Sequence, residues 1–421
     1  MFKFIHAADV HLDSPLRGLA RYESAPAESI RDACRRAFEN LVDLAIEEKV
    51  AFVLLSGDLY DGDWNDYSTG IFFSRQMGRL NDHKIRVFTA AGNHDAANRI
   101  TKALENPPNV KMLSSSKPET IKLDELMVAI HGQSFKEQHV YDNLAKDFPA
   151  AVPGFFNIGL LHTSLDGREG HASYAPCSKD DLTAKGYQYW ALGHIHKQEY
   201  VSEDPWIVFP GCIQGRHIRE TGAKGCLLVT VDDVSIDPVI EMRSLDVLRW
   251  NLCSIDLTDV EDMREVWDLT RKEIQASHKS AGDRPVAMRI RYYGSTKMVD
   301  QISANPEHFA VEVKARGAEI AGEDVWIEKV ENLVTGKRDL SAGLSDDSPL
   351  GIMLREIVNI DESPENIHGL DDVLTELKQK LPVEAYSDDG RLLLDDPDTM
   401  KHLIEEAKQM LVSKLLVEEK S

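Results

Sequence analysis

The chain has 421 residues, 42% hydrophobic residues and a formal net charge of −23. This length predicts two or three domains, and the apolar content is sufficient for packed cores. The negative charge is the wrong sign for a protein that holds nucleic acid by general phosphate neutralisation, so a tight free-standing DNA binder is disfavoured. A nuclease is not excluded, because bound divalent cations can themselves hold a phosphate.

Neither a membrane segment nor a disulfide framework is expected. The apolar start is too short for a signal peptide, and no apolar stretch approaches the length of a membrane span. We therefore expect a cytoplasmic protein without a membrane anchor. The cysteines are odd in number and show no CxxC spacing, so each is predicted to be a small buried side chain. They are Cys34, Cys177, Cys212, Cys226 and Cys253.

Residues 1–245 alternate apolar runs with helical patterns, such as the amphipathic stretch 28–48. Adjacent strands are expected in the segments "IKLDELMVAI" and "CLLVTVDDVSIDPVIEM". The pattern predicts an α/β domain, a layered sandwich of two mixed sheets flanked by helices. A further helix is expected at 67–80, with apolar residues that fit either core packing or a contact with a second copy.

Residues 246–335 are predicted to form a smaller α+β domain, because strands and helices alternate there. The expected strands are 250–257, 285–293 and 324–333, and the expected helices are 260–277 and 299–312.

A polar linker rich in Gly and Ser is expected at 336–348, followed by a helical tail at 349–421. The tail has three amphipathic stretches, and residues 341–421 carry a net charge of −11. Their apolar faces either pack on the chain's own body or dock on the helices of a partner.

Five polar groups each follow a short apolar run that is typical of a buried strand. Their members are Asp9, His11, Asp58, Asn93, His94, His162, His194 and His196. The ends of neighbouring strands would bring these side chains to one edge. Oxygen and nitrogen donors without cysteine suit manganese, iron, zinc or magnesium. There are too many ligands for one ion, so the economical interpretation is a two-metal site bridged by Asp58, of the kind that clamps the oxygens of a phosphoryl displacement.

The order of these motifs, DxH, GDxxD, GNHD, a lone His and GHxH, resembles the calcineurin-like metallophosphoesterases. The segments "HAADVHLDSPL", "YWALGHIHK" and "PGCIQGRHIRETGAKG" resemble the SbcD-type DNA-repair exonucleases, most of all their YhaO-like branch. The resemblance covers residues 1–240 well and the remainder loosely. It implies a four-layer αββα sandwich with a capping α+β domain, and a nuclease that acts 3′ to 5′ on DNA ends and as an endonuclease on single strands.

The same resemblance implies partners and metal ligands. An SbcC-type ATPase would attach through the C-terminal helices, and a homodimer could form through helix 67–80. Two divalent ions are implied, with Mn²⁺ expected and Fe, Mg or Zn as alternatives. Asp9, His11, Asp58 and His196 would hold the first ion, and Asp58, Asn93, His162 and His194 the second. Gly57, Gly92 and Gly193 precede ligands at strand ends, where a close backbone approach favours a residue without Cβ.

His94 follows a ligand directly and is expected at the rim, where it would act as the general acid for the departing oxygen, with Asp95 orienting or capping nearby. Archaeal and eukaryotic relatives tend to carry histidine at the position of Asp61, whereas SbcD-type members carry Asp. Asp61 would anchor the loop or orient a ligand histidine. Arg216, His217 and Arg99 are candidates for DNA phosphate contacts.

Two other functions stay open at this point. A small-molecule or nucleotide phosphodiesterase could use the same ligands, but it would not need the additional α+β domain and helical tail. A catalytically silent scaffold would normally show broken ligand motifs, and none is broken here.

Overall fold

The computed structural model describes residues 1–14, 27–61, 68–97, 107–166, 173–232, 237–282, 284–336, 348–360, 367 and 369–380, and single positions between 400 and 411. Arg99 and most of the expected linker lie outside these residues. By its contacts the chain divides into two units. The first comprises Met1–Ile255, Val266–Tyr292 and Asn305–Asn332, and the second Asp256–Glu265, Tyr293–Ala304 and Leu333–Ser421.

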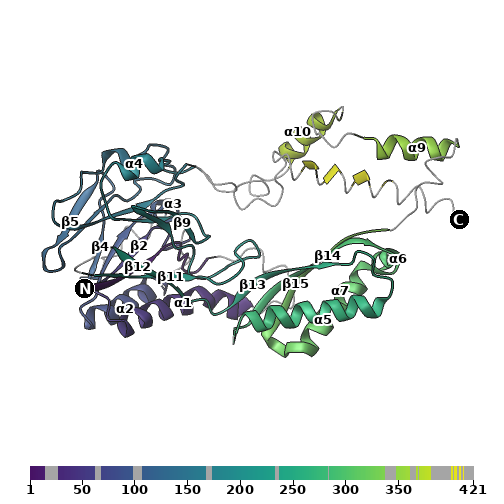
Figure 1. Ribbon diagram of the computed structural model, residues 1–421, viewed down its shortest axis with the longest axis horizontal. Coiled ribbons are helices and arrows are strands. Elements are labelled where there is room, and N and C mark those ends of the chain that lie inside the picture. Colours follow the sequence, from purple (N-terminus) through teal and green to yellow (C-terminus); the bar gives the residue numbers. More distant parts are fainter. Residues whose placement is uncertain are drawn as a thin grey trace. The chain divides into compact units, whose positions relative to one another are not determined.

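The first sheet has six strands in the order β12-β11-β1-β2-β3-β4. Figure 1 labels β2, β4, β11 and β12 among them. Their bounds are β1 Phe2–Ala7, β2 Phe52–Ser56, β3 Arg86–Ala90, β4 Val110–Met112, β11 Gly225–Val231 and β12 Pro238–Ser244. Strands β1 to β4 are parallel, whereas β11 is antiparallel to both β1 and β12. The carboxyl ends of β1, β2 and β3 therefore share one edge, and the segments with Asp9, Asp58 and Asn93 leave from it.

The second sheet also has six strands, in the order β5-β6-β7-β8-β10-β9. Their bounds are β5 Glu119–Leu123, β6 Val128–Gly132, β7 Phe156–His162, β8 Tyr189–Gly193, β9 Glu199–Glu203 and β10 Trp206–Phe209. The four inner strands are parallel, and the outer strands β5 and β9 are antiparallel to their neighbours. His162 ends β7, and His194 directly follows β8.

Alternating side chains along each strand build the layers. Phe4, Phe52 and Leu54 pack with Ile158 and Tyr189 in the core between the sheets. On the outer face of the first sheet, Ile5, Val53 and Leu55 pack against helices α1 (Ala27–Glu47) and α2 (Ser68–Asp82). On the outer face of the second sheet, Trp190 and Ile207 pack with Phe148 and Leu182, next to the 3-10 turn η4 (Leu144–Asp147) and helix α4 (Lys179–Thr183). The predicted four-layer αββα sandwich is confirmed.

Helix α2 buries most of its apolar residues in this core. Phe72, Phe73, Met77 and Leu80 are at most 5% exposed, whereas Ile71 is 66% exposed. Core packing thus accounts for the helix, and a homodimer through it stays a prediction. All five cysteines are buried and unpaired, as predicted.

The smaller α+β part has a three-stranded sheet in the order β13-β14-β15. Its elements are β13 Arg249–Asp256, α5 Met263–Ser280, β14 Val286–Thr296, α6 Val299–Ala304, α7 Pro306–Ala321, η5 Gly322–Asp324 and β15 Val325–Gly336. The prediction of one helix over 299–312 was wrong. The chain breaks at Asn305, whose side chain caps α7 by accepting a hydrogen bond from the His308 N–H, and Pro306 then opens the new helix. Proline cannot continue a helix but fits its first turn.

The tail contains α9 (Pro349–Val358) and α10 (Leu370–Lys380), and described positions between 400 and 411 are helical. Leu354 is buried, but large apolar side chains of the tail are exposed, including Met353 at 51% and Val373 at 61%. Among the described residues, no helix combines the length and apolar character that a membrane crossing requires.

Candidate metal centre

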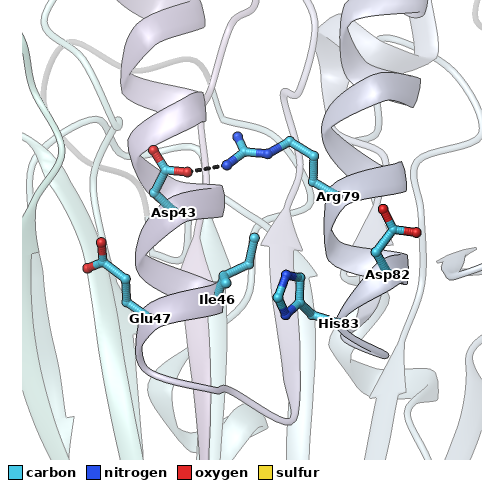
Figure 2. Close-up of a pocket in the computed structure, with 6 residues that line it drawn as sticks. All are labelled: Asp43, Ile46, Glu47, Arg79, Asp82 and His83. Carbon is cyan, nitrogen blue, oxygen red and sulfur yellow. Dashed lines mark hydrogen bonds and ion pairs between the residues drawn. The ribbon is translucent and has the colours of Figure 1, made fainter.

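One surface pocket, of about 310 Å³, lies between α1 and α2 (Figure 2). It is lined by Asp43, Ile46, Glu47, Arg79, Asp82 and His83, and Arg79 is paired with Asp43. Three carboxylates against one arginine would repel a phosphoester. None of the predicted site residues lines this pocket, so the phosphoester chemistry is expected at the strand ends.

The predicted ligands gather where the two sheets meet. Strand β2 contacts both β7 and β8, so the ends that carry Asp58, His162 and His194 come together. Four of these residues have left-handed backbone: φ is 49° at Asp9, 47° at His11, 51° at Asp58 and 106° at His194. Such conformations are strained for residues with a Cβ and concentrate at functional sites.

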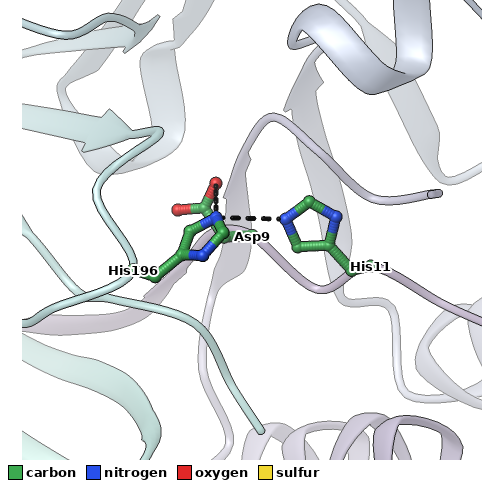
Figure 3. A group of neighbouring side chains, drawn as sticks. All are labelled: Asp9, His11 and His196. Atoms are coloured by element: carbon green, nitrogen blue, oxygen red, sulfur yellow. Dashed lines mark hydrogen bonds and ion pairs between the residues drawn. The ribbon is translucent and has the colours of Figure 1, made fainter. Parts of the chain in front are cut away.

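The first group of ligand atoms belongs to Asp9, His11 and His196 (Figure 3). The Nε2 atoms of His11 and His196 lie 3.2 Å apart, and His196 Nε2 lies 3.8 Å from Asp9 Oδ1. One potential ligand atom from each residue therefore faces a common point.

The second group surrounds Asp58 and His162. Asp58 Oδ2 lies 3.5 Å from His162 Nε2 and 4.0 Å from His11 Nε2. His162 Nε2 lies 3.1 Å from Asn93 Oδ1, and the His194 ring packs edge-on against His162 at 5.2 Å. Asp58 thus stands between the two groups, in the position that a bridging carboxylate requires.

The orientation of the imidazoles fits metal binding. His162 donates its Nδ1 hydrogen to the Ser56 carbonyl at 2.9 Å, and His196 donates its own to Glu220 Oε1 at 2.7 Å. Each ring is therefore anchored through Nδ1 and presents Nε2 to the other candidate ligands. His11 Nδ1 is buried and has no hydrogen-bond partner among the described residues.

The buried carboxylates of Asp9 and Asp58 require nearby positive charge to offset the cost of their burial. Asp9 and Asp58 are 1% and 2% exposed, and they belong with His162 to a group whose ligand atoms lie within 4.8 Å of one another. Burial raises the pKa of Asp9, and the nearby Asp58 carboxylate raises it further. Burial also opposes the ionisation of Asp58, but the histidines around it hold its pKa below the usual range. Two buried carboxylates this close are costly without a cation, so these residues fit a pair of divalent ions.

The close backbone approach predicted at Gly57 and Gly92 is confirmed. A Cβ on Gly57, where φ is +94°, would lie 2.4 Å from His162 Nδ1. A Cβ on Gly92 would lie 2.3 Å from Asp58 Oδ1. Any other residue would displace a ligand.

Replacing Gly92 by alanine is expected to lower metal content and to cost about 1–3 kcal/mol of stability, since the methyl group must displace the Asp58 carboxylate. Gly78→Ala is the matched control, because its Cβ meets nothing within 4 Å in helix α2, where alanine should stabilise by about 0.5–1 kcal/mol. Thermal unfolding and elemental analysis measure both effects. Full metal content in Gly92→Ala would show that Asp58 is not held at this position.

His94 lies at the edge of the ligand group. Its side chain is 38% exposed, and its Nδ1 lies 2.9 Å from Asp61 Oδ1. Its backbone N–H donates to Asp58 Oδ1 at 3.0 Å. Burial favours the neutral ring, but the Asp58 and Asp61 carboxylates raise the pKa of His94 to about 9.

Asp95 is buried and binds backbone groups of two loops. Its carboxylate accepts hydrogen bonds from the backbone N–H groups of Leu59, Tyr60 and Gly92. Asp95 therefore ties the loop after Asp58 to the loop before Asn93. Its predicted role beside His94 stays a prediction.

Glu220 is the residue that the sequence interpretation missed. It is 4% exposed, and its carboxylate binds both His196 Nδ1 and the Arg216 guanidinium, at 2.7 and 2.9 Å. Burial opposes its ionisation, but Arg216 and His196 hold the pKa of Glu220 well below its usual range. The i, i+4 spacing of Arg216 and Glu220 in "GRHIRE" was the available signal.

The residues predicted to contact phosphate differ in exposure: Arg216 is largely buried and His217 is exposed. Arg216 is 11% exposed and also lies 3.3 Å from Asp61 Oδ2, so its guanidinium links Glu220 to Asp61. His217 is 45% exposed and lies 3.6 Å from Glu220. Contacts of these residues with phosphate stay predictions, and Arg99 lies outside the described residues.

Replacing Glu220 by glutamine is expected to lower metal affinity by about 10- to 100-fold while the fold is kept, because the carboxylate orients the His196 ring. Glu328→Gln is the control, since Glu328 is also buried and paired with an arginine, Arg289, at 2.7 Å. Isothermal titration with Mn²⁺ gives both affinities. An equal loss in the two variants would point to general destabilisation in place of ligand orientation.

Similarity to known proteins agrees with this geometry. The family model of calcineurin-like phosphoesterases matches residues 2–198, and the model of the metallophosphoesterase YhaO middle domain matches residues 250–335. An uncharacterized metallophosphoesterase YhaO of Bacillus subtilis is 35% identical over 296 residues, which are 69% of this chain and 72% of that protein.

More distant relatives are named DNA double-strand break repair protein Mre11. The protein of Sulfurisphaera tokodaii is 26% identical over 66% of this chain and 72% of its own length. That of Saccharolobus solfataricus is 25% identical over 68% of this chain and 74% of its own. On the shared ligand motifs, the two family models and the extended similarity to YhaO, the chain belongs to the YhaO-like metallophosphoesterases of the calcineurin-like superfamily, a family of metal-dependent phosphoester hydrolases.

Proposed function

We propose that this chain is a two-metal DNA nuclease of SbcD type, which degrades DNA ends 3′ to 5′, cleaves single strands and acts in DNA repair. The observation that carries the proposal is Asp58, a buried carboxylate between the His11 and His162 ring nitrogens. The similarity to proteins named for DNA double-strand break repair supports DNA as the substrate. A cytoplasmic location is part of the proposal, since unpaired cysteines are typical of a reducing compartment.

Each residue has a defined part in this proposal. Asp9, His11, Asp58 and His196 would hold one ion, and Asp58, Asn93, His162 and His194 the other. When bound, two divalent ions, with Mn²⁺ expected, would hold the phosphoester and lower the pKa of an attacking water. His94, at the rim, would protonate the departing oxygen, and Asp61 would hold its ring through Nδ1.

The test compares Mn²⁺-dependent cleavage of an end-labelled DNA duplex with that of a small chromogenic phosphodiester. The nuclease should shorten the labelled strand from its 3′ end and cleave single-stranded DNA. Hydrolysis of the small diester alone would instead support a small-molecule phosphodiesterase. Failure on both substrates by a metal-loaded chain would indicate a scaffold.

The exposed apolar residues of the tail support the second part of the proposal, attachment of an SbcC-type ATPase. Exposed fractions are 49% at Ile352, 51% at Met353 and 61% at Val373, on helices α9 and α10. An amphipathic helix with an exposed apolar face is suited to docking on partner helices. The acidic surroundings of these faces would repel DNA.

Deleting residues 341–421 is expected to abolish co-purification with a coiled-coil ATPase while cleavage of short oligonucleotides persists, because every predicted ligand precedes residue 197. In the full chain, Met353→Glu combined with Val373→Glu should have the same effect. Val239→Glu is the matched control, since Val239 on β12 is also 61% exposed. If the truncated chain still retains the ATPase at full yield, the tail is not the docking element.

A further inference from the structure

Three aromatic side chains, Tyr174, His139 and Tyr141, lie in ring contact with one another beside the candidate metal centre, and we call them the aromatic strip. Tyr174 packs edge-on against the His194 ring, with centroids 5.5 Å apart. It lies 5.7 Å from His139 and 6.5 Å from Tyr141, and His139 stacks on Tyr141 at 6.3 Å. The strip therefore connects a predicted metal ligand to exposed rings.

Exposure increases along the strip. His194 and Tyr174 are 7% and 9% exposed, whereas Tyr141 is 70% exposed. The other exposed tyrosines of the described residues, Tyr200 and Tyr293, are 43% and 40% exposed. Packing within the protein does not account for Tyr141, because most of its ring faces solvent. An exposed ring that is continuous with a reaction centre is suited to contact a flat ligand.

Hydrogen bonds fix the strip to the strand that carries His162. The Ser164 N–H donates to the Tyr174 carbonyl at 2.8 Å, and Thr163 Oγ1 donates to the Ala175 carbonyl at 2.7 Å. The Ala175 N–H donates to the Val140 carbonyl at 2.6 Å, which joins the two segments of the strip. The backbone of both segments is thus held in place before a ligand arrives, which reduces the entropy lost on binding.

We infer that the aromatic strip is a stacking site for a nucleobase of the substrate next to the scissile phosphodiester, an inference that rests on the proposed function. A phosphate held at the ligand cluster would bring the attached nucleoside beside His194 and the strip. Stacking on aromatic side chains strengthens binding by about 5- to 150-fold per base and tolerates any base, because every base has a π-face.

The net charge of −23 means that the chain needs a way to bind DNA that does not depend on positive charge. A chain so acidic gains little from general neutralisation of phosphates, which is how most nucleic-acid binders obtain their affinity. Base stacking needs no positive charge. Single-stranded ends, with bases already unpaired, would be the form of DNA best suited to it, and a free nucleotide offers the same base and phosphate.

The test measures binding by the full chain with Ca²⁺ in place of Mn²⁺. The probes are a fluorescent oligothymidylate, an abasic strand of equal length, and dTMP as a competitor. Tyr141→Ala should weaken oligothymidylate binding by about 5- to 150-fold and leave the abasic strand unaffected, whereas Tyr141→Phe should bind as the native chain does. Tyr200→Ala is the control, because this exposed ring contacts Trp206 and is not part of the strip. Equal loss on both strands, or no loss, would refute the stacking site.

The remaining measurements identify the source of the base and separate this inference from the nuclease proposal. If dTMP competes and loses affinity in Tyr141→Ala, a single nucleotide fills the site; if only the strand is affected, the site requires a polymer, and both results support stacking.

Cleavage of the oligothymidylate and of the abasic strand is then measured with Mn²⁺. If the chain binds bases through Tyr141 but cleaves neither strand, only the nuclease proposal is contradicted. If it cleaves both strands without base-dependent binding, only the stacking site is contradicted.

Discussion

Replacing Asp58 by alanine is expected to abolish phosphodiester hydrolysis and to leave a folded chain that binds at most one equivalent of metal. Asp58 Oδ2 is the atom that lies between His11 Nε2 and His162 Nε2, so both proposed ions depend on it. A bridging carboxylate offsets the repulsion between two cations that are about 4 Å apart, and a methyl group cannot. Elemental analysis after gel filtration, combined with a cleavage assay, measures the two losses.

The control for this variant is Asp246→Ala. Asp246 is also buried, at 2% exposure, but its carboxylate pairs with Arg249 and Arg284. Its loss should lower stability and leave the metal content of the folded fraction unchanged. Two equivalents of metal in folded Asp58→Ala would show that the ions do not share this ligand.

The strand ends and their ligands could be predicted because both signals are local in sequence. Apolar runs such as Phe52–Ser56 identify buried strands, and parallel strands bring their succeeding loops to one edge of the sheet. Asp9, Asp58 and Asn93 follow three such strands. For Glu220 the local signal was limited to its i, i+4 spacing from Arg216. Its role depends on a contact with His196, 24 residues away, and a lone glutamate in a loop is more often a surface residue.

Other features depended on details of side-chain geometry. The break of the helix predicted at 299–312 comes from the cap at Asn305 and from Pro306, which outweigh the apolar spacing on both sides. The aromatic strip joins His139 and Tyr141 to Tyr174 through backbone pairing between separate segments, and no motif includes all three. The sequence made Arg216 a candidate for a phosphate contact, but it could not show the buried ion pair with Glu220 that engages its guanidinium.

Replacing His94 by alanine is expected to keep the metals and to slow DNA hydrolysis by about 100-fold or more, as is typical for the loss of a general acid. His94 is suited to this role because its side chain is 38% exposed, whereas His11 and Asp58 beside it are buried. Its Nδ1 lies on Asp61, which leaves Nε2 available to a leaving oxygen. Loss of the ring removes no proposed metal ligand. Metal content should therefore separate this variant from Asp58→Ala.

The leaving group provides the decisive comparison for His94. An alkoxide that leaves from DNA needs a proton, whereas a nitrophenolate leaves without one, so the loss in His94→Ala should shrink on a nitrophenyl phosphodiester. His83→Ala, in the pocket between α1 and α2, serves as the control and should match the native rate on both substrates. The ratio of the rate loss on DNA to the rate loss on the nitrophenyl phosphodiester distinguishes a proton donor from a residue that positions the phosphate. A ratio near one would mean that His94 positions the phosphate and donates no proton, and Asp61 would then act by fixing that contact.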